Sequence, residues 1–283
     1  MEEGEISIIS IVVEFSIYII LAIIILMIIS SFIIYPGIYT GRSKTNGPIF
    51  KLETKDKATI EGVILEPKEP KICKLTFLFF HGNSGNMGNS SDFMKHLNET
   101  FNAYVISIDY RGFGNNYGFP SESGLINDAE SIWQLIMDDN RLKDTKKIVY
   151  GRSLGGAVAI ALTSNKINNG IDGLIIENTF TSTKDVANTR EMFQKVPEFL
   201  MDIGLFINLW NSKERIKDIE IPVLYISGLK DRIVHPKMMK ELYDTCKSKN
   251  KLLLEVENGE HSNTYLVAAD KYHKSLKKLI KLL

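Results

Sequence analysis

The sequence predicts an α/β fold in which helices flank a mostly parallel sheet of eight strands. From about residue 48 onward, short β-rich runs alternate with helical patterns, as they do in folds of this class. Most of the later runs are largely apolar, which is typical of strands covered on both faces. The chain has 283 residues, 44% apolar and 24% charged, so it can bury a full-sized core.

Charge and cysteine content exclude several functions. The sequence has 34 basic and 34 acidic residues, so no net field attracts nucleic acid, and we expect no nucleic-acid partner. The two cysteines, Cys73 and Cys246, lack C-x-x-C or metal-ligand spacing. We therefore expect no disulfide framework, no metal site and no cofactor.

An acidic N-terminal tail, residues 1–14, precedes an uncharged and strongly apolar run at 15–35. A helix of that length, at about 1.5 Å per residue, is roughly as long as the hydrocarbon core of a bilayer is thick. A cleaved signal peptide would instead need a basic start, a shorter apolar core and a small-residue cleavage site. The sequence therefore predicts one transmembrane anchor at 15–35, followed by a linker at 36–49.

Basic residues are placed asymmetrically around the predicted anchor. None precedes it, whereas Arg42 and Lys44 are the first of several that follow it. The positive-inside rule then places the large C-terminal part in the cytoplasm of an endomembrane or plasma-membrane protein. Two short sequons, at Asn89 and Asn98, would favour the lumen if they were glycosylated.

Residues 50–283 are predicted to form one domain without internal repeats. The first two strands are close enough in sequence to pair as an antiparallel hairpin. Strands are expected at 50–54, 59–66, 75–80, 104–108, 148–150, 174–176, 223–227 and 252–256. Helices are expected near 91–97, 121–137, 154–163, 236–246 and 265–282.

A long insertion between the sixth and seventh strands, at about 182–215, is predicted to form a small cap. Its apolar side chains would suit the acyl chain of a substrate, or they would pack on the sheet, and both interpretations stay open. These residues are Met192, Phe193, Val196, Phe199, Leu200, Ile203, Leu205, Phe206, Leu209 and Trp210.

Residues 151–155 match G-x-S-x-G, the motif of a nucleophilic serine on a tight turn from strand to helix. The turn needs Gly151 and Gly155 because side chains two residues from Ser153 would clash. An apolar strand precedes the motif, and a helix of small residues able to pack closely on a sheet follows it. This setting favours Ser153 as a nucleophile over an ordinary turn.

A serine hydroxyl needs a base to take its proton, and in the α/β-hydrolase fold that histidine follows the serine and the acid. Of five histidines, His81 and His96 precede the motif, and His273 lies within a helix. His235 stands too close to the best acid candidate. His261 remains, in a polar loop between the last strand and the last helix, where a loop can direct the ring toward the serine.

The third catalytic group must be a carboxylate that fixes the tautomer of the imidazole. Asp231 follows the seventh strand, and Glu177 ends the sixth and is the alternative acid. We favour Asp231, which gives the chain order Ser153, Asp231, His261. Backbone N–H groups of Asn83, after the third strand, and of Leu154, after the serine, are expected to form the oxyanion hole.

Five ordered runs of the sequence resemble the bud-emergence (Bem) type of α/β hydrolase, which includes the eukaryotic membrane-anchored α/β-hydrolase domain thirteen proteins. The resemblance implies serine hydrolysis with the triad above, and its relatives include esterases, lysophospholipases and protein depalmitoylases. Arg232 and Glu260 depart from the residues that relatives often carry beside the acid and the base. The runs are 79–86, 109–114 with 120–122, 150–157, 177–181 and 227–231.

The first function hypothesis is a membrane-anchored hydrolase of acyl esters or thioesters, of lysophospholipase, monoacylglycerol lipase or depalmitoylase type. Its partners would be an acyl lipid or an acylated protein. The alternative is a catalytically silent hydrolase-fold protein that binds partners. Because the predicted anchor supplies no triad member and no oxyanion donor, we expect a chain beginning near Arg42 to hydrolyse short esters almost normally.

Overall fold

The computed structural model describes residues 8–35, 41, 44–189, 195–197, 199, 202 and 209–283. An eight-stranded sheet has the order β1-β2-β4-β3-β5-β6-β7-β8, in which β2 runs antiparallel to both of its neighbours and all other pairs are parallel. The predicted mostly parallel sheet and its N-terminal hairpin are thus confirmed. The strands are β1 (Ile49–Glu53), β2 (Thr59–Leu65), β3 (Leu75–Phe80), β4 (Tyr104–Ile108), β5 (Lys146–Arg152), β6 (Gly173–Glu177), β7 (Val223–Gly228) and β8 (Lys251–Val256).

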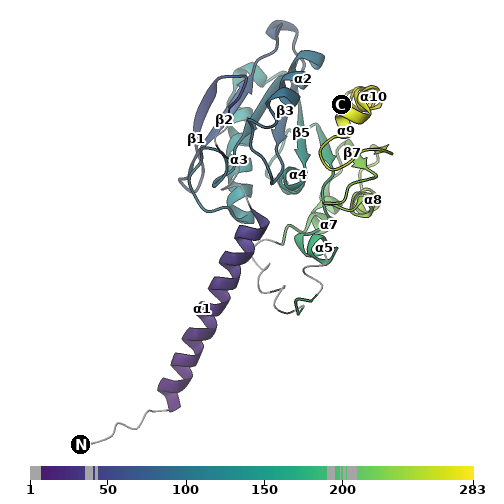
Figure 1. The fold of residues 1–283 in the computed structure, drawn as a ribbon. Coiled ribbons are helices and arrows are strands. Elements are labelled where there is room, and N and C mark those ends of the chain that lie inside the picture. The colour runs from purple at the N-terminus through teal and green to yellow at the C-terminus, as the bar shows by residue number, and fades with distance from the viewer. Residues whose placement is uncertain are drawn as a thin grey trace, which may run out of the picture.

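Helices cover both faces of the sheet (Figure 1). Every residue of β4, β6 and β7 is buried, because apolar side chains leave these strands on both faces. One core packs α3 (Glu122–Asp138), α4 (Leu154–Ser164) and α8 (Pro236–Thr245) against the sheet, and the other packs α2 (Ser91–Phe101) and α10 (Ala269–Ile280). Shorter helices are α5 (Thr183–Asn188), α7 (Ser212–Arg215), α9 (Thr264–Val267), η2 (Pro70–Ile72), η3 (Asn140–Leu142) and η5 (Ile216–Asp218).

The helix expected at 265–282 is divided into α9 and α10. Ala268, between them, leaves the helical region of backbone conformation, with φ −134° and ψ 38°. The break allows Thr264 on α9 and Tyr272 on α10 to approach the same buried carboxylate, that of Glu177. The prediction of one continuous helix at 265–282 is therefore wrong in detail.

The N-terminal helix α1 (Ile8–Ile34) projects away from the domain and meets it at its C-terminal end (Figure 1). Phe15 and Tyr18 on its shaft are 67% and 60% exposed, whereas Tyr35 just after it is completely buried. Its side chains at 8–9, 27 and 29–33 lie outside the description. Within the described residues no helix has both the length and the apolarity needed to cross a bilayer, so the predicted span at 15–35 is not confirmed.

The predicted cap at 182–215 is described only in part. It contains α5, α7 and Trp210, whose side chain is fully buried. Leu209 is 38% exposed and Phe199 is 63% exposed. Val196 is also among the described residues. The remaining apolar residues of the predicted cap lie outside them: Met192, Phe193, Leu200, Ile203, Leu205 and Phe206.

Candidate active site

Ser153 occupies a tight turn between β5 and α4. Its backbone has φ 55° and ψ −121°, a conformation that a residue with a side chain rarely adopts. A Cβ at Gly151 would lie 2.0 Å from the carbonyl oxygen of Gly155, and one at Gly155 would lie 2.1 Å from that of Phe80. The glycines of the motif are therefore required by close backbone approach, as the sequence predicted.

The turn is held by the end of β6. The N–H of Ser153 donates to the carbonyl of Glu177 at 2.9 Å, and the hydroxyl of Thr179 donates to the carbonyl of Ser153 at 2.7 Å. Thr179 also packs against Gly156, where a Cβ would lie 2.5 Å from its side chain. These contacts offset the unfavourable backbone conformation by fixing both peptide groups of the serine.

Ser153, His261 and Asp231 are brought together in one chain of hydrogen bonds. Nε2 of His261 lies 3.0 Å from Oγ of Ser153, and Nδ1 lies 2.7 Å from Oδ2 of Asp231. Oδ1 of Asp231 accepts from the N–H groups of Ile233 at 2.8 Å and Val234 at 2.9 Å. Because these backbone donors fix the buried carboxylate, its other oxygen is directed at the imidazole and selects the tautomer with a proton on Nδ1.

Asn178 connects the loops that carry the acid and the base, and the sequence reasoning did not single it out. Its side-chain amide donates to the carbonyls of Glu260 at 3.1 Å and His261 at 2.9 Å. Its Oδ1 accepts from the N–H of Gly228 at 2.8 Å, at the end of β7. Its φ of 47° lies in the left-handed region, which asparagine tolerates better than most residues. Asn178 thus helps to orient His261 by holding its backbone carbonyl.

The alternative acid, Glu177, lies in a separate buried network. Its carboxylate accepts from Nε of Arg152 at 2.9 Å, from the hydroxyl of Tyr150 at 2.5 Å, and from the hydroxyls of Thr264 and Tyr272. Burial lowers the pKa of Arg152, but the charge of Glu177 raises it, and its net pKa lies well above the usual value. The ion pair therefore persists, and Glu177 supports the fold behind the serine.

The loop after β3 passes beside the serine. A Cβ at Gly82 would lie 3.4 Å from Cβ of Ser153, which places the next residue, Asn83, at the edge of the site. The preceding His81 is buried, with Nε2 3.3 Å from Oδ1 of Asp109, and its carbonyl accepts from the hydroxyl of Tyr110 at 3.0 Å. Leu154 opens α4, where backbone N–H groups have no acceptor inside the helix. The role of Asn83 and Leu154 as oxyanion donors stays a prediction.

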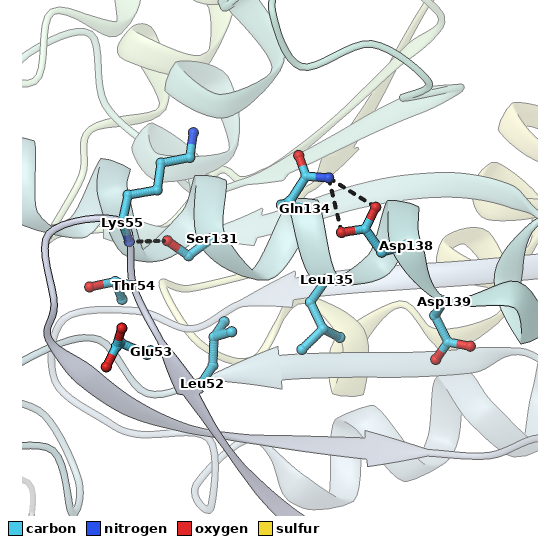
Figure 2. Close-up of a pocket in the computed structure, with 9 residues that line it drawn as sticks. All are labelled: Leu52, Glu53, Thr54, Lys55, Ser131, Gln134, Leu135, Asp138 and Asp139. Carbon is cyan, nitrogen blue, oxygen red and sulfur yellow. Dashed lines mark hydrogen bonds between the residues drawn. The ribbon is translucent and has the colours of Figure 1, made fainter.

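A separate depression lies between β1 and α3 (Figure 2). Within it, the N–H of Lys55 donates to Ser131 at 3.2 Å and Gln134 donates to Asp138 at 3.0 Å. None of its lining residues belongs to the triad, so it is not the site where the serine acts. The lining residues are Leu52, Glu53, Thr54, Lys55, Ser131, Gln134, Leu135, Asp138 and Asp139.

Metal chemistry has no obvious site in the described part of the chain, where no three histidine, cysteine or carboxylate side chains gather as ligands. Cys73 and Cys246 are both buried and unpaired with each other.

The two carboxylates should respond differently to amidation. We expect Asp231→Asn to lower kcat by about four orders of magnitude without unfolding the protein, because the imidazole loses its tautomer control. Glu177→Gln should instead destabilise the fold, on the order of 3 kcal/mol, because it removes the fully buried carboxylate that pairs with the partly buried Arg152. Ester hydrolysis per titrated active site and thermal unfolding measure the two effects. The reverse ranking of the kcat losses would make Glu177 the acid.

Comparisons with known proteins concern the fold and the family of the chain. A family profile described as "Serine aminopeptidase, S33" matches residues 72–203, and one described as "Serine hydrolase (FSH1)" matches residues 146–262. The Pyrococcus furiosus esterase Pf2001 has a similar structure, with a TM-score of 0.68 at 18% identity over 84% of this chain and 90% of that chain. The α/β-hydrolase fold is thereby confirmed.

Sequence relatives identify the family. Protein bem46 of Schizosaccharomyces pombe is 36% identical over 83% of this chain and 80% of its own length. A Saccharomyces cerevisiae protein named as a membrane protein is 37% identical over 68% of this chain and 66% of its own. Lysophosphatidylserine lipase ABHD12 of Danio rerio is 30% identical over 59% of this chain and 46% of its own. The chain therefore belongs to the Bem46 type of α/β hydrolases and is a serine hydrolase.

Proposed function

We propose that the enzyme cleaves acyl esters or thioesters through an acyl-enzyme on Ser153. The observation that carries this proposal is the chain of hydrogen bonds from Ser153 through His261 to Asp231. The imidazole takes the hydroxyl proton while Oγ attacks the acyl carbonyl carbon, and backbone N–H groups of Asn83 and Leu154 stabilise the oxyanion. His261 then protonates the leaving alcohol or thiol. Water then attacks the acyl carbonyl carbon while His261 takes its proton, and His261 gives that proton to Oγ of Ser153 as the carboxylic acid leaves.

The proposed substrate class is an acyl lipid or an acylated protein. The resemblance to lysophospholipases and depalmitoylases supports it, as does the name of the Danio rerio relative, a lysophosphatidylserine lipase. The predicted cap at 182–215 is rich in apolar residues suited to an acyl chain. A monoacylglycerol is an acyl lipid with the same kind of reacting ester.

We also propose that the protein is anchored in a membrane through residues 15–35. The uncharged and apolar character of this run supports the anchor, together with the name of the Saccharomyces cerevisiae relative. The basic residues Arg42 and Lys44, which follow the run, favour a catalytic domain on the cytoplasmic side.

Activity-based labelling tests the nucleophile. We expect a fluorophosphonate probe to label the wild type and not Ser153→Ala, because only an activated serine attacks the phosphorus. Labelled protein is detected by in-gel fluorescence, and the labelled peptide by mass spectrometry. Equal labelling of both proteins would remove Ser153 from its role, and a folded wild type that never labels would favour the silent binding protein.

Anchoring should affect delivery of the substrate rather than the bond-breaking chemistry. We compare the full chain in vesicles with a truncated variant that begins at Ser31 and so keeps Ile34 and Tyr35. Both should hydrolyse a short soluble ester at similar rates. The truncated variant should be much slower on an acyl lipid in the vesicles, because tethering raises the effective substrate concentration. Equal vesicle rates would argue for a soluble substrate.

A further inference from the structure

We infer that the segment joining α1 to the sheet is a brace that positions the oxyanion loop. The brace comprises the described residues Ile34, Tyr35, Gly41 and 44–46, and the oxyanion loop comprises residues 82–91. The inference rests on the proposed function, in which the N–H of Asn83 stabilises the oxyanion. It assigns positioning residues for catalysis to a part of the chain that contains no catalytic group.

The first contact involves Asn83 itself. Its side-chain amide donates to the carbonyl of Ile34, at the C-terminal end of α1. The other amide atom, Oδ1, is buried without a hydrogen-bond partner among the described residues. Among the described residues, the side chain of Asn83 is therefore held by its hydrogen bond to Ile34. Because Gly82 lies against Ser153, a shift of Asn83 would move the peptide next to the nucleophile.

Three further contacts follow along the same loop. Nδ2 of Asn86 donates to the carbonyl of Gly41 at 3.1 Å. The N–H of Asn46 donates to Oγ of Ser91 at 2.9 Å. At Gly88 a Cβ would lie 2.6 Å from the backbone nitrogen of Lys44, so the two backbones are in direct contact. The brace thus contacts the loop at both ends and in the middle.

Tyr35 fixes the brace to the domain. Its side chain is completely buried, and its hydroxyl accepts from Nε1 of Trp210 at 2.6 Å. The N–H of Trp210 donates to Glu122 on α3 at 2.7 Å, and Arg215 donates to the same carboxylate at 2.6 Å. The end of α1 is therefore tied to α3 and to Trp210 of the predicted cap.

The brace leads to a different expectation for a chain beginning near Arg42, which the sequence predicts to hydrolyse short esters almost normally. Such a truncation removes both Ile34 and Tyr35, and with them the hydrogen bond to Asn83. Oxyanion stabilisation depends on donors that are already in place, and the loss of one donor lowers kcat by about 100-fold to 1,000-fold. Loosening one donor should cost a part of that, about tenfold, and should leave KM nearly unchanged.

The test uses the full-length enzyme with Tyr35→Ala, and with Tyr18→Ala as the matched control. Tyr18 lies within α1, which ends just before Tyr35; it is exposed, and its hydroxyl donates to Glu14 within the helix. Active sites are counted with a fluorophosphonate. We then measure kcat per active site and KM for a short soluble ester. We also measure the affinity of a trifluoromethyl ketone, because its adduct with the serine carries an oxyanion.

We expect Tyr35→Ala to lower kcat and the affinity of the ketone by the same factor, about tenfold, while Tyr18→Ala changes neither. A purely structural role for Tyr35 would reduce the number of active sites and leave kcat per site unchanged, and that result would overturn the inference. An inactive and unlabelled wild type would overturn the proposed function instead, so the two failures are distinguishable.

A double-mutant cycle keeps the inference testable if Tyr35→Ala does not fold. Tyr35→Phe keeps the buried ring and removes the hydroxyl that accepts from Trp210, so a smaller fall in kcat is expected. If the brace acts through Asn83, then Tyr35→Phe should slow the wild type but not slow Asn83→Ala any further. Effects that simply multiply would show that Tyr35 acts elsewhere, and would contradict the brace.

Discussion

The turn that holds Ser153 between β5 and α4 is the constraint on which the rest of the site depends. Ser153 has a φ of 55°, and the turn can form only because Gly151 and Gly155 have no side chains. The strands on either side run parallel, so their carboxyl ends meet at the same edge of the sheet. The loops after β3, β7 and β8 bring Asn83, Asp231 and His261 to that edge.

Two neighbouring buried residues, Glu177 and Asn178, support the active site in different ways. The network around Glu177 joins β5, β6, α9 and α10 through Arg152, Tyr150, Thr264 and Tyr272, and it stabilises the fold. Asn178, the next residue, instead joins the acid and base loops and so orients the imidazole. One strand end therefore carries both the structural and the positioning contacts.

The sequence predicted the sheet and the residues of the site because both depend on local patterns. Apolar runs predict strands, and G-x-S-x-G followed by an acid and a histidine predicts Ser153, Asp231 and His261 in order. Contacts between distant segments have no such signal. The tie between Tyr35 and Trp210 joins residues far apart in the chain, and nothing in the apolar run at 15–35 distinguishes its last residue from the others. Asn178 and Thr179 likewise had no sequence signal of their own, and they entered the sequence analysis only within the run 177–181 that resembles the Bem type of α/β hydrolase.

The central claim is that Ser153 carries the acyl group during turnover. The most direct measurement is rapid quenching of the enzyme with a slowly hydrolysed ester, followed by mass spectrometry of the intact protein and its peptides. The account predicts a transient mass increase equal to the acyl group, located on the peptide that contains Ser153. Turnover with no covalent species, or with the acyl group on another residue, would contradict it.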